Sequence, residues 1–93
     1  MANTKLLLVE DDENLAYMEK SCFEDIIGGY EVKTAVNGKE GLKVWQDFQP
    51  DVIVSDIDMP IMDGIEMVKK IREVDGETII LFTTGLIYIA CSN

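Results

Sequence analysis

The sequence contains no histidine. This absence excludes histidine-based acid–base catalysis and a phosphohistidine on this chain, and it removes the usual zinc ligand sets. Positive charge is also scarce, because 8 lysines and arginines stand against 18 aspartates and glutamates, for a net charge of −10. Such a surface disfavours direct binding to nucleic acid or to an anionic membrane, and it favours binding of cations.

Long hydrophobic runs are missing as well. No apolar stretch approaches the roughly 20 residues that a membrane-spanning helix needs, and residues 1–5 lack the apolar core of a signal peptide. We therefore expect a cytoplasmic protein. The two cysteines, Cys22 and Cys91, have no metal-ligand spacing, and we expect a buried thiol and an incidental one. A chain of 93 residues predicts one domain at most.

Short apolar or β-branched runs alternate with helix-like stretches along the chain. Strands are predicted at residues 5–9, 30–36, 51–55 and 78–83, and helices at 14–27, after the Asn37-Gly38 turn signal, and at 65–74. The apolar residues expected to face the core are Leu15, Met18, Cys22 and Ile26 on the first helix, Leu42, Trp45 and Phe48 on the second, and Ile65, Val68 and Ile71 on the third. This alternation predicts an α/β fold with a parallel sheet and helices on both faces.

Polar side chains follow three of the predicted strands. They are Glu10, Asp11 and Asp12 after the first, Asp56 and Asp58 after the third, and Thr83 and Thr84 at the end of the fourth. Because the carboxyl ends of parallel strands meet at one edge of a sheet, we expect these groups to converge. Two carboxylates about 4 Å apart repel by about 4 kcal/mol at an effective dielectric near 20, so the cluster needs a cation. Mg²⁺ is the hard divalent ion that suits such oxygen ligands.

Four stretches resemble the receiver domain of bacterial response regulators, the chemotaxis-protein type of flavodoxin-like fold. They are LLLVEDD, NGKEGL, VIVSDIDMPIMDG and TIILFTTG, and together they cover residues 4 to about 85. The Asp-x-x-Met-Pro-x-x-Asp-Gly pattern is the most specific part of the match. The resemblance implies a doubly wound parallel sheet of four strands with three helices, followed by an apolar tail. It also implies a signalling module of a two-component system and not an enzyme.

The resemblance assigns roles by position in this sequence. Asp56 would be the phosphoacceptor, taking a phosphoryl group from a partner histidine kinase or phosphotransfer protein, and Thr84 would be the switch hydroxyl. Asp11 would bind Mg²⁺ directly and Glu10 through water. Asp56 and the backbone carbonyl of Asp58 would complete the protein ligands.

The chain departs from the family pattern after Thr84. Family members continue into a fourth helix, a fifth strand that carries a phosphoryl-binding lysine, and a fifth helix, so residues 1–93 are expected to form a single receiver-like domain without this portion. Two other functions stay open: a receiver that binds Mg²⁺ or a partner without productive phosphotransfer, and a Mg²⁺-dependent phosphatase with Asp58 as general acid. Residues 86–90 are expected to fold back as an antiparallel hairpin or to pair with another chain, giving a homodimer through this tail or through the exposed edge of the fourth strand.

Overall fold

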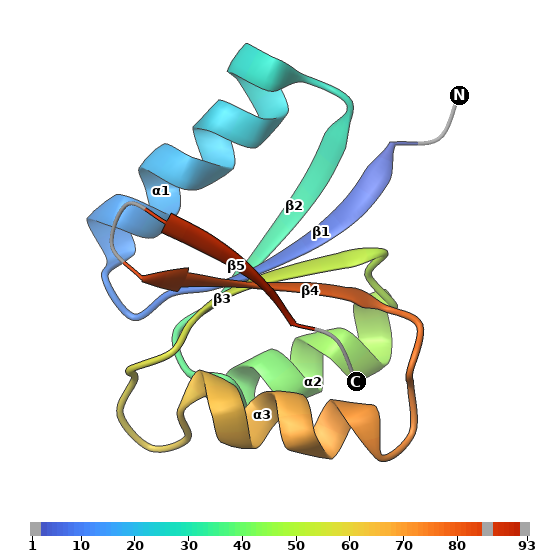
Figure 1. The fold of residues 1–93 in the computed structure, drawn as a ribbon. Helices are drawn as coiled ribbons and strands as arrows, with labels where there is room; N and C mark the ends of the chain where they lie inside the picture. Colours follow the sequence, from blue (N-terminus) through green and yellow to red (C-terminus); the bar gives the residue numbers. More distant parts are fainter. Residues whose placement is uncertain (1–2, 85–86, 92–93) are drawn as a thin grey trace.

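A five-stranded sheet forms the centre of the fold. The computed structural model describes residues 3–84 and 87–91, with Thr84 and residues 87–91 described by their backbone. The strands are β1 (Thr4–Val9), β2 (Tyr30–Ala35), β3 (Val52–Asp56), β4 (Ile79–Thr84) and β5 (Ile87–Cys91). Their order across the sheet is β2-β1-β3-β4-β5, and the first four are parallel (Figure 1). The flavodoxin-like parallel sheet predicted from the sequence is therefore confirmed.

The helices cover the two faces of the sheet unequally. They are α1 (Glu13–Ser21), the π-helix η1 (Cys22–Ile27) that continues it, α2 (Gly38–Phe48) and α3 (Gly64–Arg72). Figure 1 shows α2 and α3 together on one face and α1 on the other. Among the described residues, no helix has the length and apolar character needed to span a bilayer.

Alternate residues of the strands contribute to two separate hydrophobic cores, one on each face of the sheet. The larger core lies between the sheet and the pair α2 and α3, and its buried residues are Leu7, Val9, Ala35, Trp45, Ile53, Met67, Val68, Ile71, Ile80 and Phe82. The smaller core lies on the α1 face and contains Leu6, Leu8, Ala16, Val32 and Val54. The central strands β1 and β3 supply both cores because they are buried on both faces, as their continuous apolar runs predicted.

The predicted inward face of the first helix is wrong. Leu15, Met18 and Ile26 are 42%, 66% and 79% exposed, whereas the small Ala16 is buried and Phe23 packs beside it. Alanine lets the helix backbone approach the sheet closely. From Cys22 on, the wider turn of the π-helix η1 also changes which residues face inward, so Ile26 leaves the stripe that a constant helical period predicts.

The predicted faces of the other two helices are largely confirmed. On α3, Val68 and Ile71 are buried as expected, but Ile65 is 42% exposed and its place in the core is taken by Met67. On α2, Trp45 and Phe48 are buried as expected. The core contact of α3 therefore lies slightly further round the helix than the sequence pattern indicated.

The tail folds back on the sheet as an antiparallel strand. β5 pairs with β4 in a register that runs from Thr84 opposite Ile87 to Ile80 opposite Cys91. Of the two conformations expected for residues 86–90, the antiparallel hairpin is the one that the structure shows over residues 87–90, while Leu86 lies outside the described residues. The predicted exposed edge of the fourth strand is wrong, because β5 occupies it and becomes the edge of the sheet itself.

Candidate functional site

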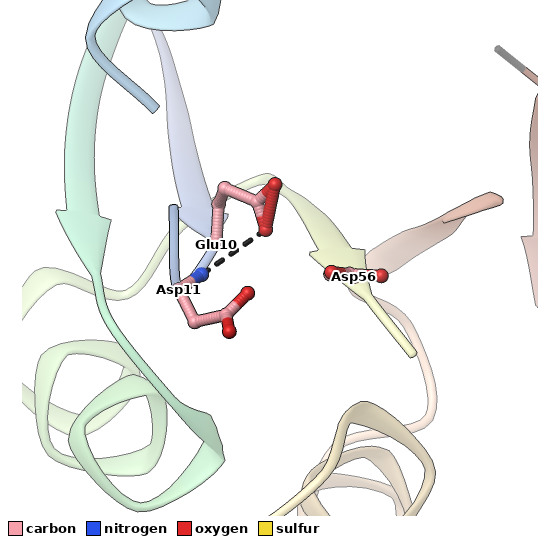
Figure 2. A group of neighbouring side chains, drawn as sticks. All are labelled: Glu10, Asp11 and Asp56. Atoms are coloured by element: carbon pink, nitrogen blue, oxygen red, sulfur yellow. Dashed lines mark hydrogen bonds between the residues drawn. The ribbon is translucent and has the colours of Figure 1, made fainter. Parts of the chain in front are cut away.

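Three carboxylates converge where β1 and β3 end. Glu10 and Asp11 directly follow β1, and Asp56 is the last residue of β3. The two strands are neighbours, with Val9 opposite Ser55, so the residues that follow come side by side. One carboxylate oxygen from each of Glu10, Asp11 and Asp56 lies within 4.8 Å of the others (Figure 2). The convergence predicted from the sequence is confirmed for these three acids, which we call the acidic cluster.

Glu10 is the buried member of the acidic cluster. Its side chain is 6% exposed, and its Oε2 accepts a hydrogen bond of 3.0 Å from the backbone N–H of Asp11. Burial raises the pKa of Glu10 from 4.5 to about 7, and the charge of Asp56, a side-chain hydrogen bond to Asp56 and the charge of Asp11 add to the effect. The folded chain therefore favours a proton or a cation at this carboxylate.

The acidic cluster has the chemistry of a site for a hard cation. Its ligands are all oxygens, and the charged groups that act on Glu10 are acids, namely Asp56, Asp11 and Glu19. Mg²⁺ takes one or two carboxylates and keeps several waters, which this partly open group of one buried, one half-buried and one exposed acid allows. The residues present therefore fit Mg²⁺.

Two other acids of the same segments serve as helix caps. Asp12 Oδ1 accepts hydrogen bonds of 3.0 and 3.1 Å from the N–H groups of Asn14 and Leu15 at the start of α1. Asp63 Oδ1 accepts one of 2.8 Å from the N–H of Glu66 at the start of α3. Asp12 was expected in the convergent group, but its carboxylate is used to satisfy the free N–H groups of the first helical turn.

Asn37 is a third cap that the sequence pattern did not identify. Asn37-Gly38 was interpreted as a turn, but Asn37 is the 94% buried N-cap of α2 and accepts a hydrogen bond of 2.9 Å from the N–H of Glu40. The next residue, Gly38, donates its N–H to the carbonyl oxygen of Met62 at 2.8 Å. The start of α2 thereby holds the loop that leads from Asp56 to α3. The signal for this role was Asn followed three residues later by Glu.

A close backbone contact fixes the position of Asp56. A Cβ atom on Gly64 would overlap the carbonyl oxygen of Asp56 and would lie 3.0 Å from Ser55 Oγ. The same carbonyl accepts a hydrogen bond of 2.8 Å from Ser55 Oγ, and Gly64 N–H donates to the carbonyl of Ile57 at 2.9 Å. Only glycine allows α3 to begin this close to the end of β3.

The remaining predicted site residues are Asp58, Thr83 and Thr84. Asp58 is exposed, and its carboxylate is not one of the three in the acidic cluster. Thr83 lies opposite Asp56 in the parallel pairing of β3 and β4, and Thr84 follows it at the strand end. The side chain of Thr84 lies outside the described part, so its role and that of the Asp58 carbonyl stay predictions.

Residues 6–89 match the family described as "Response regulator receiver domain". This chain belongs to that family. It is therefore a receiver domain of two-component signalling. Receiver domains are phosphoacceptor signalling modules and not classical enzymes, so the phosphatase hypothesis is set aside. Receiver domains use Mg²⁺ and partner with histidine kinases.

Curated relatives and solved structures agree with this assignment. The chain is 35% identical over 84 residues to the regulatory protein AtoC of Escherichia coli, covering 90% of this chain and 18% of AtoC. It is 37% identical over 78 residues to the transcriptional regulatory protein PrrA of Mycobacterium tuberculosis, covering 83% of this chain and 32% of PrrA. The chain thus spans less than a third of the length of either relative.

Two solved receivers share the fold. The Vibrio cholerae chemotaxis protein CheY4 superposes with a TM-score of 0.81 at 38% identity, covering 90% of this chain and 73% of CheY4. The receiver domain of the Francisella response regulator 1452 gives a TM-score of 0.81 at 34% identity, covering 90% of this chain and 68% of the other.

Proposed function

We propose that Asp56 accepts a phosphoryl group from a partner histidine kinase, or from a phosphotransfer protein, in the presence of Mg²⁺. The observation that carries this proposal is the convergence of Glu10, Asp11 and Asp56 within 4.8 Å at the carboxyl edge of the sheet. Clustered carboxylates raise the energy of the folded chain unless a cation or a proton neutralises them. A divalent cation held here would also neutralise negative charge on a phosphoryl group bound to Asp56.

The chemistry requires one bond to form as another breaks. An Oδ atom of Asp56 bonds to phosphorus, and the bond from phosphorus to the donor nitrogen breaks, with the electron pair leaving on that nitrogen, which is then protonated. The product is an acyl phosphate on Asp56. A bound Mg²⁺ would supply charge neutralisation on the transferring oxygens. Asp11, Glu10 and the Asp58 carbonyl would hold the ion in this proposal, and the Gly64 contact would keep Asp56 in place.

We assign the switch hydroxyl to Thr84 as part of the same proposal. Thr83 lies opposite Asp56 across the β3–β4 pair, and Thr84 is the next residue toward the carboxyl edge where the acidic cluster lies. A hydroxyl at that strand end can donate a hydrogen bond to a phosphoryl oxygen on Asp56. The proposal also includes a cytoplasmic location, which is typical of receivers. It further includes that residues 1–93 form a single domain.

Incubation with Mg²⁺ and acetyl phosphate, followed by intact mass measurement, tests the proposal. We expect the chain to gain the mass of one phosphoryl group, and we expect Asp56→Asn to abolish the gain. Asp58→Asn is the matched control, because it removes an exposed carboxylate of the same loop and keeps the backbone carbonyl. An adduct that persists in Asp56→Asn, or no adduct at saturating Mg²⁺, would contradict the proposal.

A receiver that binds Mg²⁺ without productive phosphotransfer is the second candidate. No lysine or arginine follows Arg72 in the sequence, so the lysine that the family places after its fourth strand has no counterpart in these 93 residues. Without that cation, less positive charge is available to stabilise the phosphoryl group. This candidate predicts that Mg²⁺ raises the melting temperature while acetyl phosphate leaves the mass unchanged.

A further inference from the structure

The sheet has two edges that differ in their protection. β2 and β5 are the outer strands, and each presents one row of backbone N–H and C=O groups that no other described strand pairs with. An edge of this kind can pair with a strand of another chain unless charge, proline or a covering segment prevents it. A second polypeptide can therefore pair with the sheet only at an edge that is not protected in this way.

Charged residues protect only one of these edges. β2 contains Glu31 and Lys33, both exposed, and such side chains disfavour an added strand. β5 spans Ile87–Cys91, a segment of five residues without charge or proline. The β5 edge is therefore the one that the sequence leaves open to pairing.

The distribution of charge favours a second copy of this chain at the β5 edge. Each copy carries a net charge of −10, and two copies repel one another over most of their surfaces. No charged side chain follows Glu77, so β4 and β5 form the part of the sheet where this repulsion is weakest. Two strongly acidic copies can therefore approach one another at the β5 edge without bringing charged side chains of the edge strand together.

Apolar surface beside this edge adds to the attraction. An apolar cavity of about 330 Å³ lies between η1 and β4, lined by Glu19, Cys22, Phe23, Ile27 and Leu81. Leu81 pairs with Ala90 of β5, so the cavity reaches to within one strand of the edge. Burial of apolar area would favour association in addition to the backbone pairing.

We propose that two copies of this chain form a symmetric dimer by antiparallel pairing of β5 with β5. Antiparallel pairing of a strand with itself is compatible with a two-fold axis, so the contact closes at two copies and does not propagate. The four parallel strands and β5 of each copy then belong to one continuous sheet. The pairing lies on the side of β4 away from β3 and does not depend on phosphotransfer at Asp56.

Light scattering of the purified chain tests the dimer. We expect twice the mass of a single chain for the wild type in the micromolar range. We expect Ile89→Lys, which puts a charge in the middle of β5, to return the mass to that of one chain. Glu31→Gln is the matched control, since it changes the net charge by the same one unit at the β2 edge, and it should stay dimeric. A monomeric wild type, or a dimer that Ile89→Lys leaves intact, would overturn the proposal.

Hydrogen exchange on the wild type gives a second test that needs no variant. The amides of β5 should exchange more slowly as the protein concentration rises, because pairing protects them, whereas the amides of β2 should exchange at a constant rate. Concentration-dependent protection at β2 without any at β5 would place the contact on the other edge and refute this one.

Discussion

Replacing Glu10 by glutamine should stabilise the Mg²⁺-free chain at neutral and alkaline pH. Glu10 is 6% exposed, and burial together with Asp56 raises its pKa from 4.5 to about 7. Between these two values the folded chain holds a proton that the unfolded chain has released. The unfolding free energy of the wild type therefore falls as the pH rises from 4.5 to 7, and the penalty is complete above pH 7. Below pH 4.5 both states are protonated and the penalty vanishes.

The size of the effect follows from the same geometry. A change in pKa from 4.5 to about 7 corresponds to about 3 kcal/mol, since each unit is worth about 1.36 kcal/mol. Coulomb repulsion between two charges 4.8 Å apart, the limit of separation in the acidic cluster, is also about 3 kcal/mol at an effective dielectric near 20. We expect the unfolding free energy of Glu10→Gln to exceed that of the wild type by up to about 3 kcal/mol at pH 8. Near pH 4.5 the two unfolding free energies should be equal.

Urea unfolding in the presence of EDTA measures this difference at several pH values. Trp45 is the single tryptophan and is 9% exposed, so its fluorescence reports on the core. Glu73→Gln, at an exposed position beyond α3, is the control and should show no gain that depends on pH. Added Mg²⁺ at pH 8 should stabilise the wild type more than Glu10→Gln. A variant that is less stable than the wild type at pH 8 without Mg²⁺ would refute the reasoning.

Three further substitutions test other parts of the structure by urea unfolding. Gly64→Ala should lower the unfolding free energy by about 2 kcal/mol, because the added Cβ overlaps the Asp56 carbonyl oxygen. Ile61→Asn should raise it by about 1 kcal/mol, because Ile61 is 78% exposed with φ 71°, a conformation that a β-branched residue resists and asparagine tolerates. Asp75→Asn should lower it by about 1 kcal/mol at pH 7, because hydrogen bonds from Thr78 and from the backbone N–H of Glu77 lower the pKa of Asp75 to about 2. This last difference should disappear as the pH falls from 3.8 through about 2, where the wild-type carboxylate becomes protonated.

Controls separate these causes from general effects of substitution. Gly29→Ala adds a Cβ in open space at φ 85°, so it should cost only the strain of the left-handed backbone, about 1 kcal/mol. If Gly29→Ala and Gly64→Ala lower the unfolding free energy equally, the contact between Gly64 and Asp56 does not contribute to stability. A loss of stability in Ile61→Asn, or an effect of Asp75→Asn that persists at pH 2, would contradict the corresponding explanation.

The sequence predicted the parallel sheet and the acidic cluster because both depend on strand ends. Continuous apolar runs mark β1 and β3 as buried on both faces, and Glu10, Asp11 and Asp56 follow them directly. Once the strands are parallel neighbours, their carboxyl ends must meet, and side-chain detail is not needed to place these acids together.

The sequence could not decide which acids join the acidic cluster and which cap a helix. Asp11 and Asp12 are adjacent and chemically the same, yet Asp12 is the N-cap of α1 and its carboxylate accepts from the N–H groups of the first turn, whereas the Asp11 carboxylate lies in the acidic cluster. Asp63 is likewise used at α3. Such choices depend on backbone angles at single residues, which composition and spacing do not specify.

The first helix and the tail also needed the structure. Ala16, which marks the buried face of α1, is too small to stand out in a hydrophobic pattern, and the π-helix η1 breaks the constant period on which the prediction for Ile26 rested. For residues 86–90, an antiparallel hairpin and pairing with another chain use the same backbone hydrogen bonds, so the sequence left both open. The structure pairs β5 with β4 and leaves the other side of β5 as the edge.

The identity of the phosphorylated residue is the most direct test of the proposed function. After incubation with Mg²⁺ and acetyl phosphate, borohydride reduction converts an aspartyl phosphate to homoserine, which peptide mass spectrometry locates. We predict homoserine at position 56 and unmodified aspartate at Asp11 and Asp58. Homoserine at either of those two positions, or a phosphoryl group on a residue that borohydride does not reduce, would contradict the assignment of Asp56 as the phosphoacceptor.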